Sequence, residues 1–174
     1  MRSTKGDILI ELQRAWAPRG VDRFYNLARS GYYDDSRFFR IRDKDFAQFG
    51  IHGESAVAQA WRNERIADDP VVQSNRRGTV AFAMGTEPND RTTQVYINLK
   101  DKTELDEIGF AVMGKVIDGM DVADSLYSGY GETAAGGIRG GKQDVAFEGG
   151  NDYFSGNFPE LDSIIEVIVD SAEE

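Results

Sequence analysis

Short runs of β-forming residues recur along the whole chain, and this succession most limits the folds open to it. The runs occupy residues 7–12, 38–42, 46–49, 78–84, 93–99, 110–117 and 161–169, and a short strand at 1–4 would precede a turn at 5–7. They do not alternate with helices as the strands of a parallel α/β sheet do. The pattern therefore predicts a mainly β fold, a closed antiparallel barrel of seven or eight strands with helices covering its open ends.

Only two stretches have the apolar spacing of a helix. In residues 18–30, Val21, Phe24, Tyr25 and Ala28 fall at i, i+3, i+4 and i+7, and a second, shorter helix is predicted over residues 120–127. The segment from 129 to 159 is rich in glycine and is predicted to be a loop. A chain of 174 residues suffices for one well-filled core, so we expect a single domain over residues 1–174.

Charge and composition exclude several functions. The formal net charge of −10 opposes binding to phosphate backbones and to anionic membranes, so neither a nucleic acid nor a membrane is expected as partner. The chain has no cysteine, which excludes disulfides, thiol catalysis and thiolate metal sites. The N-terminus lacks the features of a signal peptide. Because a signal could have been removed, the compartment stays open between the cytoplasm and export.

The stretch 36–50 reads as a hairpin that carries a polar pair. Its first strand would place Phe38 and Arg40 on one face and Phe39 on the other, and the return strand begins at Phe46. Arg40 and Gln48 would then project from neighbouring strands into a common space among aromatic side chains. Taken alone, such an arginine most often has a structural role, stacking on a ring or pairing with a carboxylate.

The motifs along the chain, in order and spacing, resemble those of the cyclophilin-type peptidyl-prolyl cis-trans isomerases. The similarity runs from about Thr4 to Ile168, and variants such as DDPVVQSN and YSGYGE resemble a divergent, bacterial-like branch. The motifs are TKGDILIEL, PRGVDRFYNLARSGYYDD, RFFRI, FAQFGIHG, GTVAFAM, PNDRTTQVYINL, LDEIGFAVMGKVIDGMDVADSLYSGYGE and SIIEVIV.

This resemblance implies an eight-stranded closed barrel with a helix at each end and an active groove on its outer face. Arg40 corresponds to the catalytic arginine of the family and Gln48 to the glutamine that holds the substrate backbone. By the same resemblance the substrate-binding residues are Phe39, Asp45, Phe46, Gly85, Gln94, Tyr96, Leu105 and Phe110. The expected partners are proline-containing peptides and unfolded protein clients, and the expected state is a monomer.

The chemistry of such an enzyme fits these residue types. Rotation about an X-Pro bond faces a barrier of about 18–20 kcal/mol because the C–N bond has partial double-bond character. In the twisted state the prolyl nitrogen gains a lone pair, which a guanidinium can stabilise by a hydrogen bond. No covalent bond is broken in this rotation, so no nucleophile, metal or cofactor is required. The single His52 cannot form a metal site alone.

Asp45 departs from the family pattern, because an aromatic residue usually stands there and helps to wall the proline ring. Two readings are open: Asp45 pairs with Arg40 and holds its guanidinium away from the substrate, or it points to solvent while Phe46 fills the gap. The first predicts a weakened isomerase, in which Asp45→Phe would raise kcat/KM. The alternative function is a binding module of the same fold that grips proline-containing peptides without catalysis.

Overall fold

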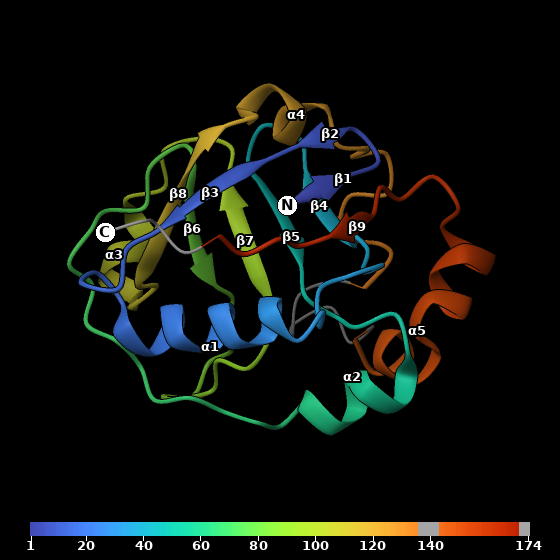
Figure 1. Ribbon diagram of the computed structural model, residues 1–174, viewed down its shortest axis with the longest axis horizontal. Coiled ribbons are helices and arrows are strands. Elements are labelled where there is room, and N and C mark those ends of the chain that lie inside the picture. The colour runs from blue at the N-terminus through green and yellow to red at the C-terminus, as the bar shows by residue number, and fades with distance from the viewer. Residues whose placement is uncertain (136–142, 171–174) are drawn as a thin grey trace.

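The computed structural model describes residues 1–135 and 143–170, and its strands form two antiparallel sheets (Figure 1). The larger sheet has six strands in the order β3-β8-β6-β7-β5-β4, and the smaller has the order β2-β1-β9. The strands are β1 Arg2–Ser3, β2 Gly6–Asp7, β3 Leu9–Leu12, β4 Arg40–Arg42, β5 Phe46–Phe49, β6 Thr79–Phe82, β7 Val95–Asn98, β8 Val112–Asp118 and β9 Ile164–Glu166. The helices are α1 Pro18–Arg29, α2 Ser55–Trp61, α3 Glu104–Ile108, α4 Met120–Ser125 and α5 Gln143–Asn157.

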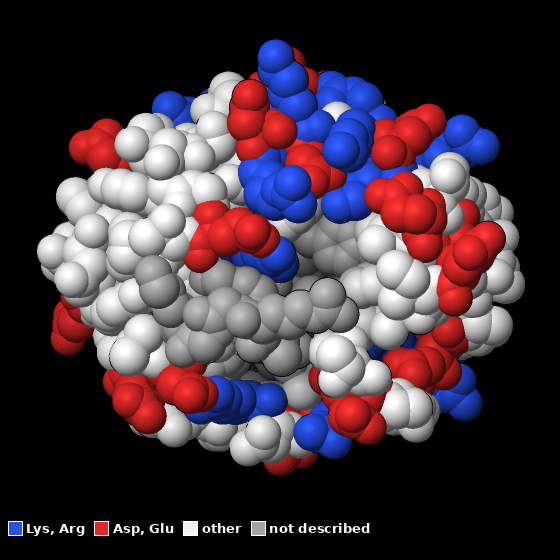
Figure 2. Space-filling model, turned by 180° about the vertical axis from the view of Figure 1, so that it is seen from behind, with Lys and Arg blue, Asp and Glu red and all other residues white. Residues whose placement is uncertain are grey.

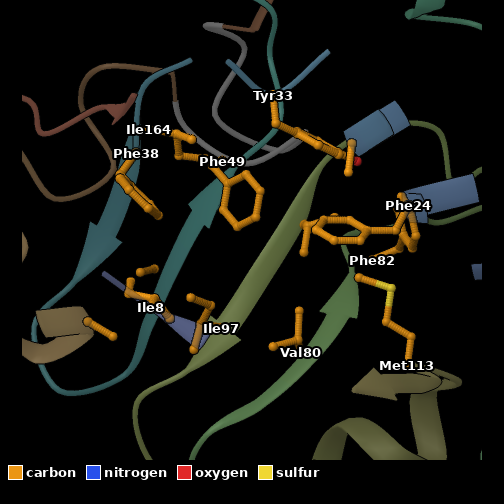
Figure 3. Packing of buried hydrophobic residues seen from close by; sticks show 14 of the residues in the cluster. Ile8, Phe24, Tyr33, Phe38, Phe49, Val80, Phe82, Ile97, Met113 and Ile164 are labelled. Carbon is orange, nitrogen blue, oxygen red and sulfur yellow. The ribbon is translucent and has the colours of Figure 1, made fainter. Parts of the chain in front are cut away.

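Alternation along the central strands separates the core from the outer face of the larger sheet. Val80 and Phe82 of β6 and Ile97 of β7 belong to the main core, whereas their neighbours Ala81 and Tyr96 join a separate cluster on the other face. Figure 3 shows the core side, where these strand residues meet Phe24 of α1. Ile164 of β9 and Ile8, which lies between β2 and β3, pack in the same core. The residues of the candidate site lie on the opposite side of the same strands, because side chains alternate with period two.

Helix α1 is fixed at its N-terminus by a carboxylate from a distant loop. Pro18 occupies the first turn, which suits its fixed φ angle. The side chain of Asp69 accepts hydrogen bonds from the backbone N–H groups of Arg19 (3.1 Å) and Gly20 (2.8 Å). The same carboxylate pairs with the buried guanidinium of Arg91 at 3.1 Å. One buried ion pair therefore joins the helix to the loops that follow α2 and β6.

The mainly β prediction is confirmed, and so are the first predicted helix, now Pro18–Arg29, and the second, now Met120–Ser125. Helices α2, α3 and α5 were not predicted. The described strands form two separate sheets, so closure into one barrel stays a prediction. No helix in the described ranges combines the length and apolarity that a membrane span needs.

The prediction of a loop over 129–159 was wrong for Gln143–Asn157, which forms α5 with a kink at Gly150. Glycine tolerates the positive φ of 51° at that kink. The helix is stabilised by packing: its buried Phe147 and Phe154 form a second hydrophobic cluster with Phe39 and Ile51. Burial of these rings outweighs the poor helix propensity of the glycines.

Candidate active site

The β4–β5 hairpin brings Arg40 and Gln48 together, as the sequence predicted. They are direct partners across the antiparallel ladder, and Gln48 is in turn opposite Tyr96 of β7. A hydrogen bond of 2.9 Å runs from Arg40 Nη1 to Gln48 Oε1. The strand is shorter than predicted, however: β4 begins at Arg40, and Phe38 lies in the main core with Ile41 instead of sharing the face of Arg40.

A pocket of about 220 Å³ opens beside this pair. Its volume is below the roughly 300–1,000 Å³ of sites for drug-sized ligands, so it suits one small side chain rather than a cofactor. In Figure 2 the surface is hollowed, and Lys and Arg side chains gather beside the hollow. The pocket is lined by Arg40, Arg42, Phe46, Gln48, Ala83, Met84, Tyr96, Lys102, Leu105 and Phe110.

Aromatic side chains form the apolar walls of the pocket. Tyr96 and Phe110 meet edge to face with ring centroids 5.8 Å apart. The ring of Phe46 lies beneath two cations, with Arg40 Cζ 4.7 Å and Lys102 Nζ 5.0 Å from its centroid. Such contacts restrict both cations to the pocket wall.

Asn75, which the sequence analysis missed, ties three parts of the wall together. Its side-chain oxygen accepts a hydrogen bond from the Tyr96 hydroxyl at 3.0 Å, and its Nδ2 donates to the backbone oxygen of Phe110 and to Asp106 of α3, each at 2.8 Å. Burial raises the pKa of Tyr96, so its hydroxyl remains a protonated donor. Asn75 thus fixes Tyr96 and Phe110, two of the three aromatic residues of the pocket, relative to α3.

A chain of side-chain amides continues from Arg40 along the groove. Gln48 Nε2 donates to Gln94 Oε1 at 2.8 Å, and Gln94 and Gln143 exchange two hydrogen bonds of 3.0 and 3.1 Å. A second, smaller cavity of about 70 Å³ adjoins this chain, with Arg40 and Gln48 lining both cavities. The predicted residues Gly85 and Gln94 lie here rather than in the apolar pocket.

Both readings of Asp45 were wrong. Asp45 is buried, and its carboxylate contacts Lys102 Nζ at 2.9 Å, Arg42 at 3.3 Å and Lys100 at 3.4 Å instead of Arg40 or solvent. Burial alone would raise the pKa of Asp45, but the two ammonium groups outweigh it and hold that pKa below its ordinary value. Asp45 does not line the pocket; it holds Lys102, which does.

Phe39, which the resemblance assigned to the substrate, does not line the pocket. It is fully buried and stacks on Phe154 of α5, with ring centroids 6.2 Å apart. The other predicted pocket residues, Phe46, Tyr96, Leu105 and Phe110, do line the pocket.

A carboxylate does reach Arg40, but it comes from a part of the chain predicted to be a loop. Glu132 Oε1 accepts a hydrogen bond of 2.7 Å from Arg40 Nε and a second bond from Nη2. Glu132 belongs to the motif YSGYGE, whose position in the sequence gives no indication of this contact. Several residues around the site were therefore not predicted from the sequence: Asn75, Lys102, Glu132 and Gln143, and also Arg42, Ala83 and Met84 of the pocket lining.

The fold and the site define a class of protein: a mainly β domain that presents a fixed guanidinium and a row of amides beside an apolar pocket sized for one small side chain. The family model described as "Cyclophilin type peptidyl-prolyl cis-trans isomerase/CLD" matches residues 1–138. The chain therefore belongs to the cyclophilin-type peptidyl-prolyl cis-trans isomerases, and its activity is peptidyl-prolyl isomerisation. Helix α5 and strand β9 lie beyond the matched range.

Curated relatives and solved structures agree with this assignment. Peptidyl-prolyl cis-trans isomerase B of Escherichia coli is 32% identical over 151 residues, which cover 82% of this chain and 88% of that protein. A peptidyl-prolyl cis-trans isomerase of Streptomyces antibioticus is 31% identical over 139 residues, covering 72% of this chain and 80% of that protein. The crystal structure of a cyclophilin-type isomerase of Cryptosporidium parvum, determined in the presence of the dipeptide Ala-Pro, has a TM-score of 0.68 at 19% identity and covers 97% of this chain and 96% of that one.

Proposed function

We propose that Arg40 is the catalytic residue of this isomerase and that Gln48 holds the substrate backbone beside it. One observation carries the proposal: the guanidinium of Arg40 lies over the ring of Phe46, bonded to Gln48, at the border between an apolar pocket and an amide-lined cavity. A peptide that places its proline ring in the first cavity would bring the adjoining peptide bond to Arg40.

In this arrangement each part of the site has a separate task. The proline ring packs against Phe46, Tyr96 and Phe110, while the amides of Gln48 and Gln94 bind the flanking backbone. The X-Pro bond between these two anchors is then the one that turns. Arg40 donates a hydrogen bond to the prolyl nitrogen as its lone pair develops, an interaction stronger in the twisted state than in the planar one.

The substrates we propose are proline-containing peptides and unfolded protein clients. The Cryptosporidium parvum structure determined with Ala-Pro supports a proline ligand for this fold. We also propose that residues 1–174 form one domain, that the strands close into an eight-stranded barrel, and that the protein acts as a monomer. The pairing that suggested a weakened activity, Asp45 with Arg40, is not formed, so that reason for low turnover does not apply.

A protease-coupled assay on a proline tetrapeptide tests the role of Arg40. Removal of one preorganised donor typically costs about 10²–10³ in rate, so Arg40→Ala is expected to lower kcat/KM by about that factor. Arg29→Ala is the matched control, because Arg29 is an exposed arginine of α1 that stacks on Tyr25. A wild-type protein that binds the peptide in an NMR titration without accelerating its isomerisation would instead establish the binding module.

A further inference from the structure

The guanidinium of Arg40 is bonded on two sides. Glu132 accepts from Nε and Nη2, and Gln48 accepts from Nη1. The Arg40 side chain keeps 23% of its surface exposed and that of Glu132 keeps 47%. The contact therefore sits at the edge of the groove, with Arg40 on its inner side.

The backbone places the Glu132 carboxylate at this point. The N–H of Ile41, the residue after Arg40, donates to the carbonyl oxygen of Gly131, the residue before Glu132, at 3.2 Å. The turn that carries Glu132 is closed by hydrogen bonds from Gly131 N to Ser128 O and from Thr133 N to Tyr130 O, each 2.9 Å long. Glu132 is thus presented to Arg40 by a loop docked on β4, and not by a freely moving segment.

This loop is also anchored by aromatic packing. The ring of Tyr130 lies edge to face with Tyr127 at 5.2 Å and with Phe158 at 5.1 Å. Phe158 and Tyr130 both pack against the second hydrophobic cluster, which contains Phe39 next to Arg40. The chain segments that carry Glu132 and Arg40 therefore both pack against the same hydrophobic cluster.

The hydrogen bonds leave part of the guanidinium available. A guanidinium carries five N–H donors in a rigid plane. Within the part of the chain that the structure describes, the bonds to Glu132 and Gln48 use three of them. One N–H on Nη1 and one on Nη2 remain. Because Arg40 still lies over Phe46 and lines both cavities, Glu132 does not draw it out of the groove.

We propose that Glu132 is a positioning residue of this isomerase: it occupies the Nε side of Arg40 and so directs the two remaining N–H groups toward the substrate. This inference rests on the catalytic role proposed for Arg40. Its effect is preorganisation, since a guanidinium fixed before binding needs no reorientation in the twisted state. The opposite effect, a carboxylate that reduces activity by neutralising Arg40, is an outcome that the experiment distinguishes.

The test compares Glu132→Ala with Glu132→Gln in the protease-coupled assay, with the peptide Kd measured by NMR. Glu132→Ala is expected to lower kcat/KM about tenfold, since displacement of a catalytic group by about 1 Å can cost up to 10²-fold and the Gln48 and Phe46 contacts remain. The peptide Kd should stay within about twofold of wild type. Glu132→Gln should keep at least about half of the activity, because its amide oxygen can still accept from Nε. Glu160→Ala, at an exposed carboxylate that is not among the contacts of Arg40, is the control.

Two further measurements make the test decisive. In an Arg40→Ala background, Glu132→Ala should have no additional effect, because the residue it positions is absent. The Nε–H of Arg40, assigned by its loss in that variant, should exchange with water faster in Glu132→Ala than in wild type. Glu132→Ala activity equal to or above that of wild type, with Arg40→Ala inactive, would overturn this inference alone. An active Arg40→Ala would instead overturn the role proposed for Arg40.

Discussion

Replacing Asp45 by asparagine tests the structural reading of the residue that departs most from the family pattern. The substitution keeps the shape of the side chain and removes its charge. The carboxylate is 8% exposed and contacts Lys102, whose side chain is 13% exposed and lines the pocket. We therefore expect Asp45→Asn to destabilise the protein and loosen one wall of the pocket, without freeing Arg40.

The magnitude follows from the three contacts. Arg42 and Lys100 are each 55% exposed on their side chains, and exposed pairs contribute about 0–1 kcal/mol. The contact with Lys102 is a short ion pair, and breaking a fully buried ion pair costs about 3–5 kcal/mol. Because the Lys102 side chain keeps 13% of its surface exposed, the expected loss lies below that range, at about 2–3 kcal/mol in the free energy of unfolding. For a chain of this size, that corresponds to a fall in Tm of about 4–12 °C.

The loss should depend on pH with a definite sign. The pKa of Asp45 is lower in the folded than in the unfolded state, despite burial, because Lys102 and Lys100 favour its charged form. Its contribution to stability is then fully present above the unfolded pKa of about 3.9 and is lost as the pH falls through the folded pKa. The difference in unfolding free energy between wild type and Asp45→Asn should be constant from about pH 7 to pH 5 and shrink below about pH 4.

Urea unfolding at each pH measures this difference, with Asp43→Asn as control because Asp43 is exposed two residues away. The protease-coupled assay on the same variants supplies the functional test. We expect kcat/KM of Asp45→Asn to stay at or below the wild-type value. A several-fold rise, with a stability close to that of wild type, would refute the reasoning and restore the idea that Asp45 restrains Arg40.

Two further substitutions test the contacts that shape the site and the fold. Asn75→Ala should lower the unfolding free energy by about 2–3 kcal/mol and weaken peptide binding, because it leaves buried partners unpaired. Asn63→Ala, at an exposed asparagine, is the control, and unchanged peptide affinity of Asn75→Ala in NMR titrations would contradict the role of Asn75. Asp69→Asn should cost about 3 kcal/mol by removing the buried partner of Arg91 and the N-terminal bonds of α1. Asp68→Asn, at a more exposed carboxylate, should cost under about 1 kcal/mol, and equal losses in urea unfolding would disprove this account.

The sequence was sufficient to predict what local periodicity and order determine. The hairpin that carries Arg40 and Gln48 and the first helix follow from periodicity, whereas most residues of the apolar pocket follow only from the resemblance to the cyclophilin-type isomerases. Their positions depend on backbone pairing, in which a residue's face is set by its place in the strand. Phe38 was predicted to share the face of Arg40, but β4 begins only at Arg40, so the alternation assumed for 38–42 does not hold before it.

The remaining residues of the site could not be predicted because tertiary contacts place them. Glu132 reaches Arg40 across 92 positions in sequence, and Lys102 reaches Asp45 across the turn after β7. Helix α5 has poor local propensity and forms because Phe147 and Phe154 find partners on Phe39 and Ile51. The spacing of residues within one sequence motif gives no information on tertiary contacts between segments that are distant in the sequence.

Exchange NMR on a proline tetrapeptide tests the central claim most directly, because one sample reports both binding and interconversion of the cis and trans forms. With catalytic amounts of wild-type protein, cross-peaks between the two forms should appear on a timescale far shorter than the uncatalysed time of about 10–100 s. With Arg40→Ala the peptide should still bind, as shown by shifts of its proline signals, while the cross-peaks disappear. If the cis and trans forms exchange as fast with Arg40→Ala as with wild type, the result would contradict the claim that the Arg40 guanidinium catalyses rotation of the X-Pro bond.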